Sequence, residues 1–331
     1  SFALLAYVSA WLKCHYPAAF YCALLNSQPM GFYSPSQLLQ DARRHGIKVA
    51  PIDVNQSDWQ HTLESCNAPE EPTLRLGFRL IKGLAQTTAR QIVSARHGPE
   101  NGQPRLFSNI EDIARRGSIS TSNMTLLGSA GALDSLTSHR RQAHWQILAT
   151  EDQRPLLDAA PVDPTNKSHS NSLTTTIPHS TDPGESRFTP LDEIQRLRAD
   201  YSTTGVTLGR HPMQILRERF PRFERCKRHA DLAALGHRRF VRIAGIVTGR
   251  QRPGTDSGVI FLTLEDETGN SNIVVWKSVQ QRCRQALLKA QLLMVKGVIE
   301  TEGSVVHVIA QQLTDCSELL YETEIRSRDF H

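Results

Sequence analysis

The sequence predicts an α+β chain of several domains, with a helical first half, a polar linker and a small five-stranded β-barrel towards the end. Three observations support this fold class. Up to about residue 150, apolar residues recur at the spacing of three and four that is typical of helices. Between 151 and 188, large apolar side chains are scarce. From about residue 236, alternating and β-branched runs replace the helical spacing.

The first domain, residues 1–70, is predicted to be helical. An apolar stripe runs along Phe2 to Lys13, and Pro17 restarts the helix. Ser34, a capping residue, comes directly before a proline and predicts a third helix from Pro35 to His45, which Gly46 ends. The segment "IKVAPIDVN" that follows suits a brief strand and a loop. Because the chain starts with Ser inside a helix that we expect to be buried, we expect a fragment whose upstream part is missing.

The second domain, 71–150, contains the segment "LIKGLAQTTARQIVSAR", a glycine-centred turn that leads into a helix. In a helix-hairpin-helix, such glycines let the backbone approach a phosphate, and the N–H groups at the start of the second helix point at it. Gly83 and Leu84 fit this pattern. Ala85 replaces the second glycine, so either this position is not left-handed or the phosphate-binding shape is degraded. The alternative is a plain bend between two core helices.

A second helix pair follows in "FSNIEDIARRGSISTSNMTLLGSAGALDSL". Ser108 is predicted to cap a helix over Ile110 to Arg116 that Gly117 ends, and Thr121 or Ser122 to cap the next helix. Two hairpins in tandem, together with basic residues around the first one, favour contact with DNA. These basic residues are Lys82, Arg90, Arg96 and His97.

The remaining chain divides into a disordered linker (151–188), a helical connector (189–235), a barrel (236–315) and a tail (316–331). Pro212 suits the first turn of a connector helix. Turns at Thr268-Gly269-Asn270 and Glu302-Gly303 mark two hairpins of the barrel, and one helix, Ser278 to Lys289, separates its third and fourth strands. Three strands, a helix and two strands is the order of an OB-fold, a barrel that commonly binds single-stranded nucleic acid.

Candidate contacts on this barrel are aromatic side chains for stacking bases and basic side chains for phosphates. Phe261 alternates away from the more apolar face of its strand and is expected to be exposed, whereas Trp276 fits the surface and the core equally well. Burial in the barrel core is the alternative for both aromatics. The basic candidates that flank them are Arg242, Arg250, Arg252 and Lys277.

We find no candidate catalytic residue and no metal site. The motifs GxxxxGK[ST], HExxH and GxSxG are absent, and the acids of "LEDET" and "FSNIEDIA" suit turns and helix caps. Six cysteines without a CxxC pair indicate reduced thiols in a cytosolic protein rather than zinc ligands or disulfides. The apolar start is too short to span a bilayer. The net charge of +5 favours a polyanionic partner weakly.

Several long segments resemble bacterial C-family replicative polymerases, the polymerase III alpha type, and most of all their error-prone, damage-inducible branch. They are the stretch from "SFALLAYVSAWLKCHYPAAF" to "SDWQHTLE", then "ADYSTTGVTLGRHPM", "GRQRPGTDSGVIFLTLEDETGNSNIVVW" and "RSRDFH". The resemblance implies that 1–70 ends the polymerase fingers domain and that the palm with its metal-binding aspartates lies upstream. No catalytic residue is therefore carried over to this chain.

The resemblance implies the DNA-binding, C-terminal part of a cytoplasmic, Mg²⁺-dependent DNA polymerase for translesion synthesis, with no cofactor in this chain and no membrane. The hairpins would hold duplex and the barrel the template single strand. Accessory proteins of a mutagenesis cassette and the sliding clamp are the further partners implied. The alternative is a stand-alone, non-catalytic single-strand-binding module or a decayed gene product. The DNA-contact candidates are Lys82, Gly83, Leu84, Ala85 and Arg90 in the hairpin, and Arg242, Arg250, Arg252, Phe261, Trp276 and Lys277 in the barrel.

Overall fold

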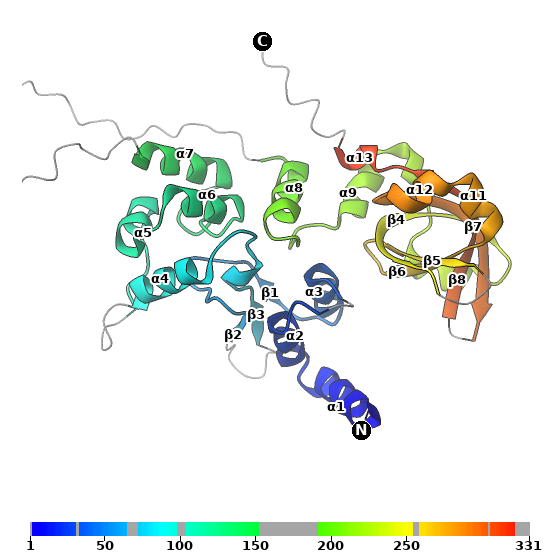
Figure 1. The fold of residues 1–331 in the computed structure, drawn as a ribbon, viewed down its shortest axis with the longest axis horizontal. Coiled ribbons are helices and arrows are strands. Elements are labelled where there is room, and N and C mark those ends of the chain that lie inside the picture. The colour runs from blue at the N-terminus through cyan, green and yellow to red at the C-terminus, as the bar shows by residue number, and fades with distance from the viewer. Residues whose placement is uncertain are drawn as a thin grey trace, which may run out of the picture. The chain divides into compact units, whose positions relative to one another are not determined.

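A computed structural model describes residues 2–30, 33–64, 72–97, 104–151, 191–253, 258–303 and 305–321. The chain divides into two compact units, Ser1–Leu208 and Gly209–His331. The first unit is mainly helical and the second contains a closed five-stranded barrel, which confirms the α+β prediction (Figure 1). The division falls inside the segment predicted as a connector. The predicted linker, beyond its first residue, lies outside the described residues.

The first unit packs helices around a small three-stranded sheet. Strand β3 lies in the middle of this sheet, parallel to β1 and antiparallel to β2. One continuous core runs from α2 through the sheet to α7. The elements are α1 (Phe2–His15), α2 (Pro17–Asn26), α3 (Pro35–Arg44), β1 (Val49–Ala50), β2 (Thr62–Glu64), β3 (Thr73–Arg75), the 3₁₀ helix η1 (Phe78–Leu80), α4 (Gln86–His97), α5 (Ile110–Gly117), α6 (Thr121–Ser129), α7 (Arg140–Glu151) and α8 (Glu193–Thr203).

Helix α1 differs from the expectation of a buried helix, because none of its residues is buried in this unit. Phe2 is 84% exposed, and Tyr7 is 67% exposed. The apolar side chains are present as the sequence predicts, but no described element of the unit covers them. An ion pair at the end of the helix, between Lys13 Nζ and Asp41 Oδ2 at 2.9 Å, joins α1 to α3.

The bounds of α3 and α5 agree with the prediction to within a residue, but the caps of two helices differ from it. Ser34 caps α3 and forms a capping box with Gln37, as expected. Helix α5 is capped by Asn109 instead of Ser108, and α6 by Ser120 instead of Thr121 or Ser122. In both cases the residue directly before the helix has extended backbone angles, which aim its side-chain oxygen at the N–H three residues on.

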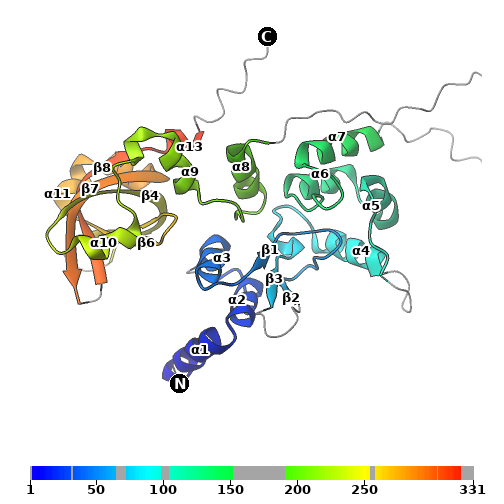
Figure 2. The same cartoon turned by 180° about the vertical axis from the view of Figure 1, so that it is seen from behind.

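The second unit is a five-stranded barrel with strand order β4-β5-β6-β8-β7. Side chains of the strands and of three helices form its core. Leu232 belongs to α10, and Val279 and Leu287 belong to α11 and α12. Helix α10 lies beside β6 in Figure 2. The elements are α9 (Pro212–Arg219), the 3₁₀ helix η2 (Pro221–Phe223), α10 (His229–Leu235), β4 (Phe240–Gln251), β5 (Ile260–Glu265), β6 (Asn270–Val275), α11 (Lys277–Arg282), α12 (Arg284–Lys289), β7 (Leu292–Glu302), β8 (Val305–Asp315) and α13 (Glu318–Tyr321).

The barrel confirms the predicted order of three strands, helix and two strands, with one correction. The single helix expected from Ser278 to Lys289 is two short helices that meet at Cys283, whose backbone leaves helical geometry (φ −116°, ψ 28°). The predicted turns at Gly269 and Gly303 join β5 to β6 and β7 to β8. Pro212 starts α9, as expected.

No helix in the described parts of the chain is both long enough and apolar enough to cross a membrane.

His61 makes the stability of the first unit depend on pH. Burial, helped by the charge of Arg79, lowers the pKa of His61 to about 4, and its Nδ1 accepts the N–H of Gly77 at 3.1 Å. The unfolded chain therefore binds a proton that the folded chain does not between pH 6.5 and 4. We expect stability to be complete above pH 6.5 and to fall by on the order of 1 to 3 kcal/mol towards pH 4.

Urea unfolding at a series of pH values measures this loss. His61→Gln keeps an acceptor but does not titrate, so its stability should fall less over the same window. His15→Gln is the control, because that histidine is exposed and belongs to the same unit. Equal pH dependence of the wild-type chain and His61→Gln would contradict the role given to His61.

Candidate nucleic-acid interface

The first hairpin turn joins η1 to α4 and has the shape that the sequence predicts. Gly83 is left-handed, with φ +84°, and Leu84 is buried in the core of the unit. A methyl group placed on Gly83 would meet only Leu126 Cδ1 at 3.7 Å, so backbone conformation, and not space, favours glycine here. Lys82 holds the turn against α8: its N–H donates to Thr203 O at 2.8 Å, and its Nζ donates to Tyr201 O at 2.9 Å.

Ala85, the residue that departs from the usual glycine pattern, is not left-handed. Among the described residues other than glycine, only Ser118 and Arg238 have a positive φ. Ala85 is exposed and its carbonyl accepts the N–H of Ala89, so it begins the hydrogen bonding of α4. The sequence left two possibilities: that this position is not left-handed, or that the phosphate-binding shape is degraded. The structure supports the first, because Ala85 does not need the conformational freedom of glycine.

The second hairpin turn, between α5 and α6, repeats the first one. Ser118 is left-handed (φ +49°), Ile119 is buried, and Ser120 precedes the helix. These residues stand in the places of Gly83, Leu84 and Ala85. The repeat continues into the helices, where Met124 and Leu127 are buried at the positions that correspond to Ala89 and Ile92. Sequence reasoning found the second hairpin but placed its turn at Gly117 and missed Ser118.

The two hairpins contact each other through equivalent residues. Asn123 Nδ2 donates to Thr88 Oγ1 at 3.1 Å, and Asn123 and Thr88 both lie on the first turn of the second helix of their hairpin. A contact between equivalent positions is what an approximate two-fold relation would produce. The two turns are therefore parts of one paired unit.

An open groove of about 570 Å³ lies between α4 and the second turn. Most of the residues that line it are polar or basic; they are Thr87, Arg90, Gln91, Ser94, Ala95, Arg116, Gly117 and Ser118. Arg90 is exposed and forms no hydrogen bond or ion pair with any described residue. A guanidinium without an internal partner is available to an external anion.

Two other arginines of this domain serve the fold. Arg96, expected in the basic set, is buried and donates to Ser57 O at 2.9 Å and to Asp58 Oδ1 at 2.8 Å. Arg116 donates to Ala95 O at 2.6 Å and to Asp112 Oδ2 at 3.0 Å. Burial alone would raise the pKa of Asp112, but the hydrogen bonds and charge of Arg116 and the N–H of Ser108 hold that pKa below its usual value.

On the barrel, both candidate aromatics are exposed. Phe261 is 38% exposed on β5, and Trp276, which follows β6, is 49% exposed. Phe261 pairs with Val274 on β6, and Trp276 is two residues further along the same face. Such diagonal neighbours lie within reach of one another. The predicted exposure of Phe261 is confirmed, and Trp276 lies at the surface instead of in the core.

The four basic candidates of the barrel are not all in one place. Lys277 lies over Gly258, next to β5, and Arg252 is exposed just after β4. Arg250 instead donates from Nε to Leu287 O at 2.9 Å and from Nη2 to Ala290 O, so it binds the end of α12. Arg242 lies near the opposite end of β4, where its pairing partner is Lys296 on β7.

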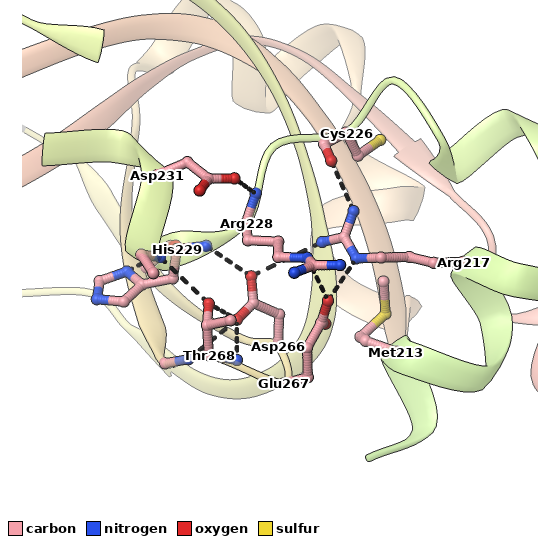
Figure 3. Close-up of polar contacts among 12 residues, drawn as sticks. Met213, Arg217, Cys226, Arg228, His229, Asp231, Asp266, Glu267 and Thr268 are labelled. Carbon is pink, nitrogen blue, oxygen red and sulfur yellow. Dashed lines mark hydrogen bonds and ion pairs between the residues drawn. The ribbon is translucent and has the colours of Figure 1, made fainter. Parts of the chain in front are cut away.

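The acidic segment "LEDET" connects the barrel to the helices that precede it (Figure 3). Asp266 accepts the N–H of Gly269 at 2.9 Å within the hairpin turn, and the N–H of His229 at 2.7 Å from α10. Glu267 Oε1 lies 2.9 Å from Arg217 Nε and 3.1 Å from Arg228 Nε. These acids therefore serve a turn and a helix start, as the sequence predicts.

No group of three or more His, Cys, Asp or Glu side chains within the described ranges could hold a metal ion.

The paired hairpins and the barrel together define a nucleic-acid-binding protein. A family model described as a helix-hairpin-helix motif matches residues 46–143, and one described as an OB-fold nucleic acid binding domain matches residues 241–315. Among solved structures, part of the chain is similar to asparaginyl-tRNA synthetase from Pyrococcus horikoshii (22% identity, 28% of this chain and 22% of that chain, TM-score 0.25). At this level of similarity that structure has no bearing on function.

Relatives match along the whole chain. The error-prone DNA polymerase of Teredinibacter turnerae is 49% identical over 341 residues, and that of Saccharophagus degradans is 47% identical over 335 residues. Each match covers 100% of this chain and 30% of the relative. Along its whole length the chain is similar to these error-prone DNA polymerases, and it spans less than a third of their length. Its hairpins and barrel fit their C-terminal part.

Loss of Arg217 should destabilise the second unit, because its ion pair with Glu267 is buried. Both side chains are almost enclosed, at 10% and 11% exposure. Without Arg217 the buried Glu267 carboxylate keeps only Arg228, whose side chain is 56% exposed, and the donor to Cys226 O is lost. Breaking a buried pair in this way typically costs about 3 to 5 kcal/mol. We therefore expect Arg217→Ala to lower the free energy of unfolding of this unit by about that amount, measured by urea denaturation.

Arg219→Ala is the matched control, because Arg219 is an exposed cation on the same helix. It should change stability by less than about 0.5 kcal/mol. A loss of the same size in both variants would show that Arg217 is not distinguished by its buried partner.

Proposed function

We propose that the chain is the DNA-binding part of an error-prone polymerase that acts in damage-induced translesion synthesis. In this proposal the paired hairpins hold duplex DNA and the barrel contacts the template single strand. The observation that carries it is the pairing of two like turns, one centred on Gly83 and one on Ser118. A duplex offers two phosphate backbones, and a pair of equivalent turns supports one contact with each.

For the barrel, the support comes from exposed aromatic side chains on an outer face. Burying Phe261 and Trp276 would be favourable, yet both remain at the surface beside Lys277. A single strand presents flat bases to stack on such side chains and phosphates for the neighbouring cation.

We propose no catalytic residue in this chain. The buried carboxylates Asp112, Glu265 and Asp266 have internal partners: Arg116, His211 and the N–H of His229, respectively. In this proposal the Mg²⁺-dependent step of the whole polymerase uses residues that this chain does not supply. The cytoplasm, the sliding clamp and the proteins of a mutagenesis cassette are further proposals, which rest on the family resemblance.

Arg90 tests the duplex contact. If its guanidinium neutralises one phosphate, Arg90→Ala should weaken duplex binding and reduce the slope of log affinity against log salt by about 0.9. Fluorescence anisotropy of a labelled duplex across a salt series gives this slope. Arg115→Ala is the control: Arg115 is on α5, has a side chain that is 74% exposed, and does not line the groove. Equal slopes for the two variants would contradict a contact at Arg90.

Phe261 tests the single-strand contact. Phe261→Ala should cost about 1 to 3 kcal/mol in binding to a single-stranded oligonucleotide if the ring stacks on a base. Leu288→Ala is the control, because Leu288 is an exposed apolar residue of the same unit on α12. Circular dichroism checks that both variants are folded. Unaltered affinity in a folded Phe261→Ala chain would remove this face from the proposal.

A further inference from the structure

The outer surface of strands β4 and β7 is divided into two halves of different character. One half is apolar and covered: Ala244 and Leu292 are buried beneath α9, η2 and α13, with Met294 packed beside them. Two residues further along the ladder, Arg242 and Lys296 take the corresponding outward places. Their neighbours in sequence, Val241, Ile243 and Val295, point into the barrel core. The covering helices thus leave a basic half of the same surface open.

Arg242 and Lys296 are directly opposite each other in the β4–β7 ladder. Like charges in this position repel and destabilise a sheet. Neither side chain forms an ion pair or a hydrogen bond with a described residue. The sequence offers little to neutralise them, because no Asp or Glu occurs from Asn270 to Ile299 or from Phe240 to Gly254. The protein alone therefore retains a repulsion that a bound anion would relieve.

A groove of about 600 Å³ lies on this open half, and its lining includes aromatic and amide side chains as well as cations. It is bordered by Phe240, Arg282, Cys283, Lys296, Gln311 and Gln312. Phe240 is 61% exposed, which is more than either Phe261 or Trp276. The two glutamine side chains offer amide donors and acceptors. Arg282 is fixed at the edge of the groove, where its Nη2 donates to Gln311 O at 3.3 Å.

We propose that this groove is a second binding site for single-stranded nucleic acid. Phe240 stacks on a base, and phosphates are neutralised by Lys296 in the groove and by Arg242, its partner on the neighbouring strand. A flat aromatic side chain beside unpaired cations and amides fits a nucleotide better than an acidic peptide, which has no ring to stack. The site is distinct from the Phe261 face: Phe240 begins β4, whereas the residue paired with Phe261 is Gln251, the last residue of β4. The inference rests on the proposed function and extends the path of the same strand.

The test uses the whole 331-residue chain and a fluorescent oligo-dT of about 30 nucleotides, which exceeds the ~4 to 16 that one OB-fold occupies. Arg242→Ala with Lys296→Ala should lower the slope of log affinity against log salt by about 1.4, since each phosphate contact on a single strand contributes ~0.7. Phe240→Ala should weaken binding roughly tenfold. The control pair is Arg284→Ala with Lys289→Ala, which removes two exposed cations from α12.

The inference would be overturned if the wild-type chain binds oligo-dT and the double variant of Arg242 and Lys296 has the same salt slope as the control double variant. Absence of salt-dependent binding by the wild-type chain would instead overturn the proposed function. Thermal melting provides the check on folding: without DNA, removing the opposed charges should leave the melting temperature unchanged or raise it. If that pair loses affinity for polyglutamate but not for oligo-dT, the groove binds an acidic protein and the inference is wrong.

Discussion

A left-handed residue followed by a buried apolar one is the constraint on which the candidate interface depends. At Gly83 and again at Ser118 the chain reverses through a positive φ, and the next side chain, Leu84 or Ile119, enters the common core. This anchor fixes where the second helix of each hairpin starts and therefore where its first N–H groups point. The contact between Thr88 and Asn123 joins two helices that are already set in this way.

Much of this fold could be predicted from the sequence, because its signals are local. Gly83 marks the first turn, and period-two alternation marks the strands of the barrel. The signals failed where conformation depended on tertiary contacts. Ser118 adopts a conformation that serine rarely takes, and nothing in its own type reveals it. Cys283 interrupts a helix without glycine or proline, while Val279 and Leu287 on either side of it both reach the core.

The site was harder to predict than the fold, because the sequence does not show whether an arginine side chain binds other groups of the protein or an external ligand. Arg96 and Arg250 were reasonable candidates, yet the structure uses their guanidinium groups to satisfy backbone carbonyls. Arg90 and Arg242 form no hydrogen bond or ion pair with a described residue. Only the three-dimensional neighbours distinguish them, because five donors in a fixed geometry suit a carbonyl and a phosphate equally well.

The two hairpin turns also differ in their freedom to change during evolution. Any other residue in place of Gly83 would have to adopt the left-handed backbone conformation, at a cost of about 1 to 2 kcal/mol. Ser118 already bears that cost, so exchange for glycine, asparagine or aspartate there brings no further penalty. The second turn can therefore acquire new hydrogen-bonding chemistry without loss of folding. A search guided by glycine spacing would recognise the first hairpin and pass over its partner.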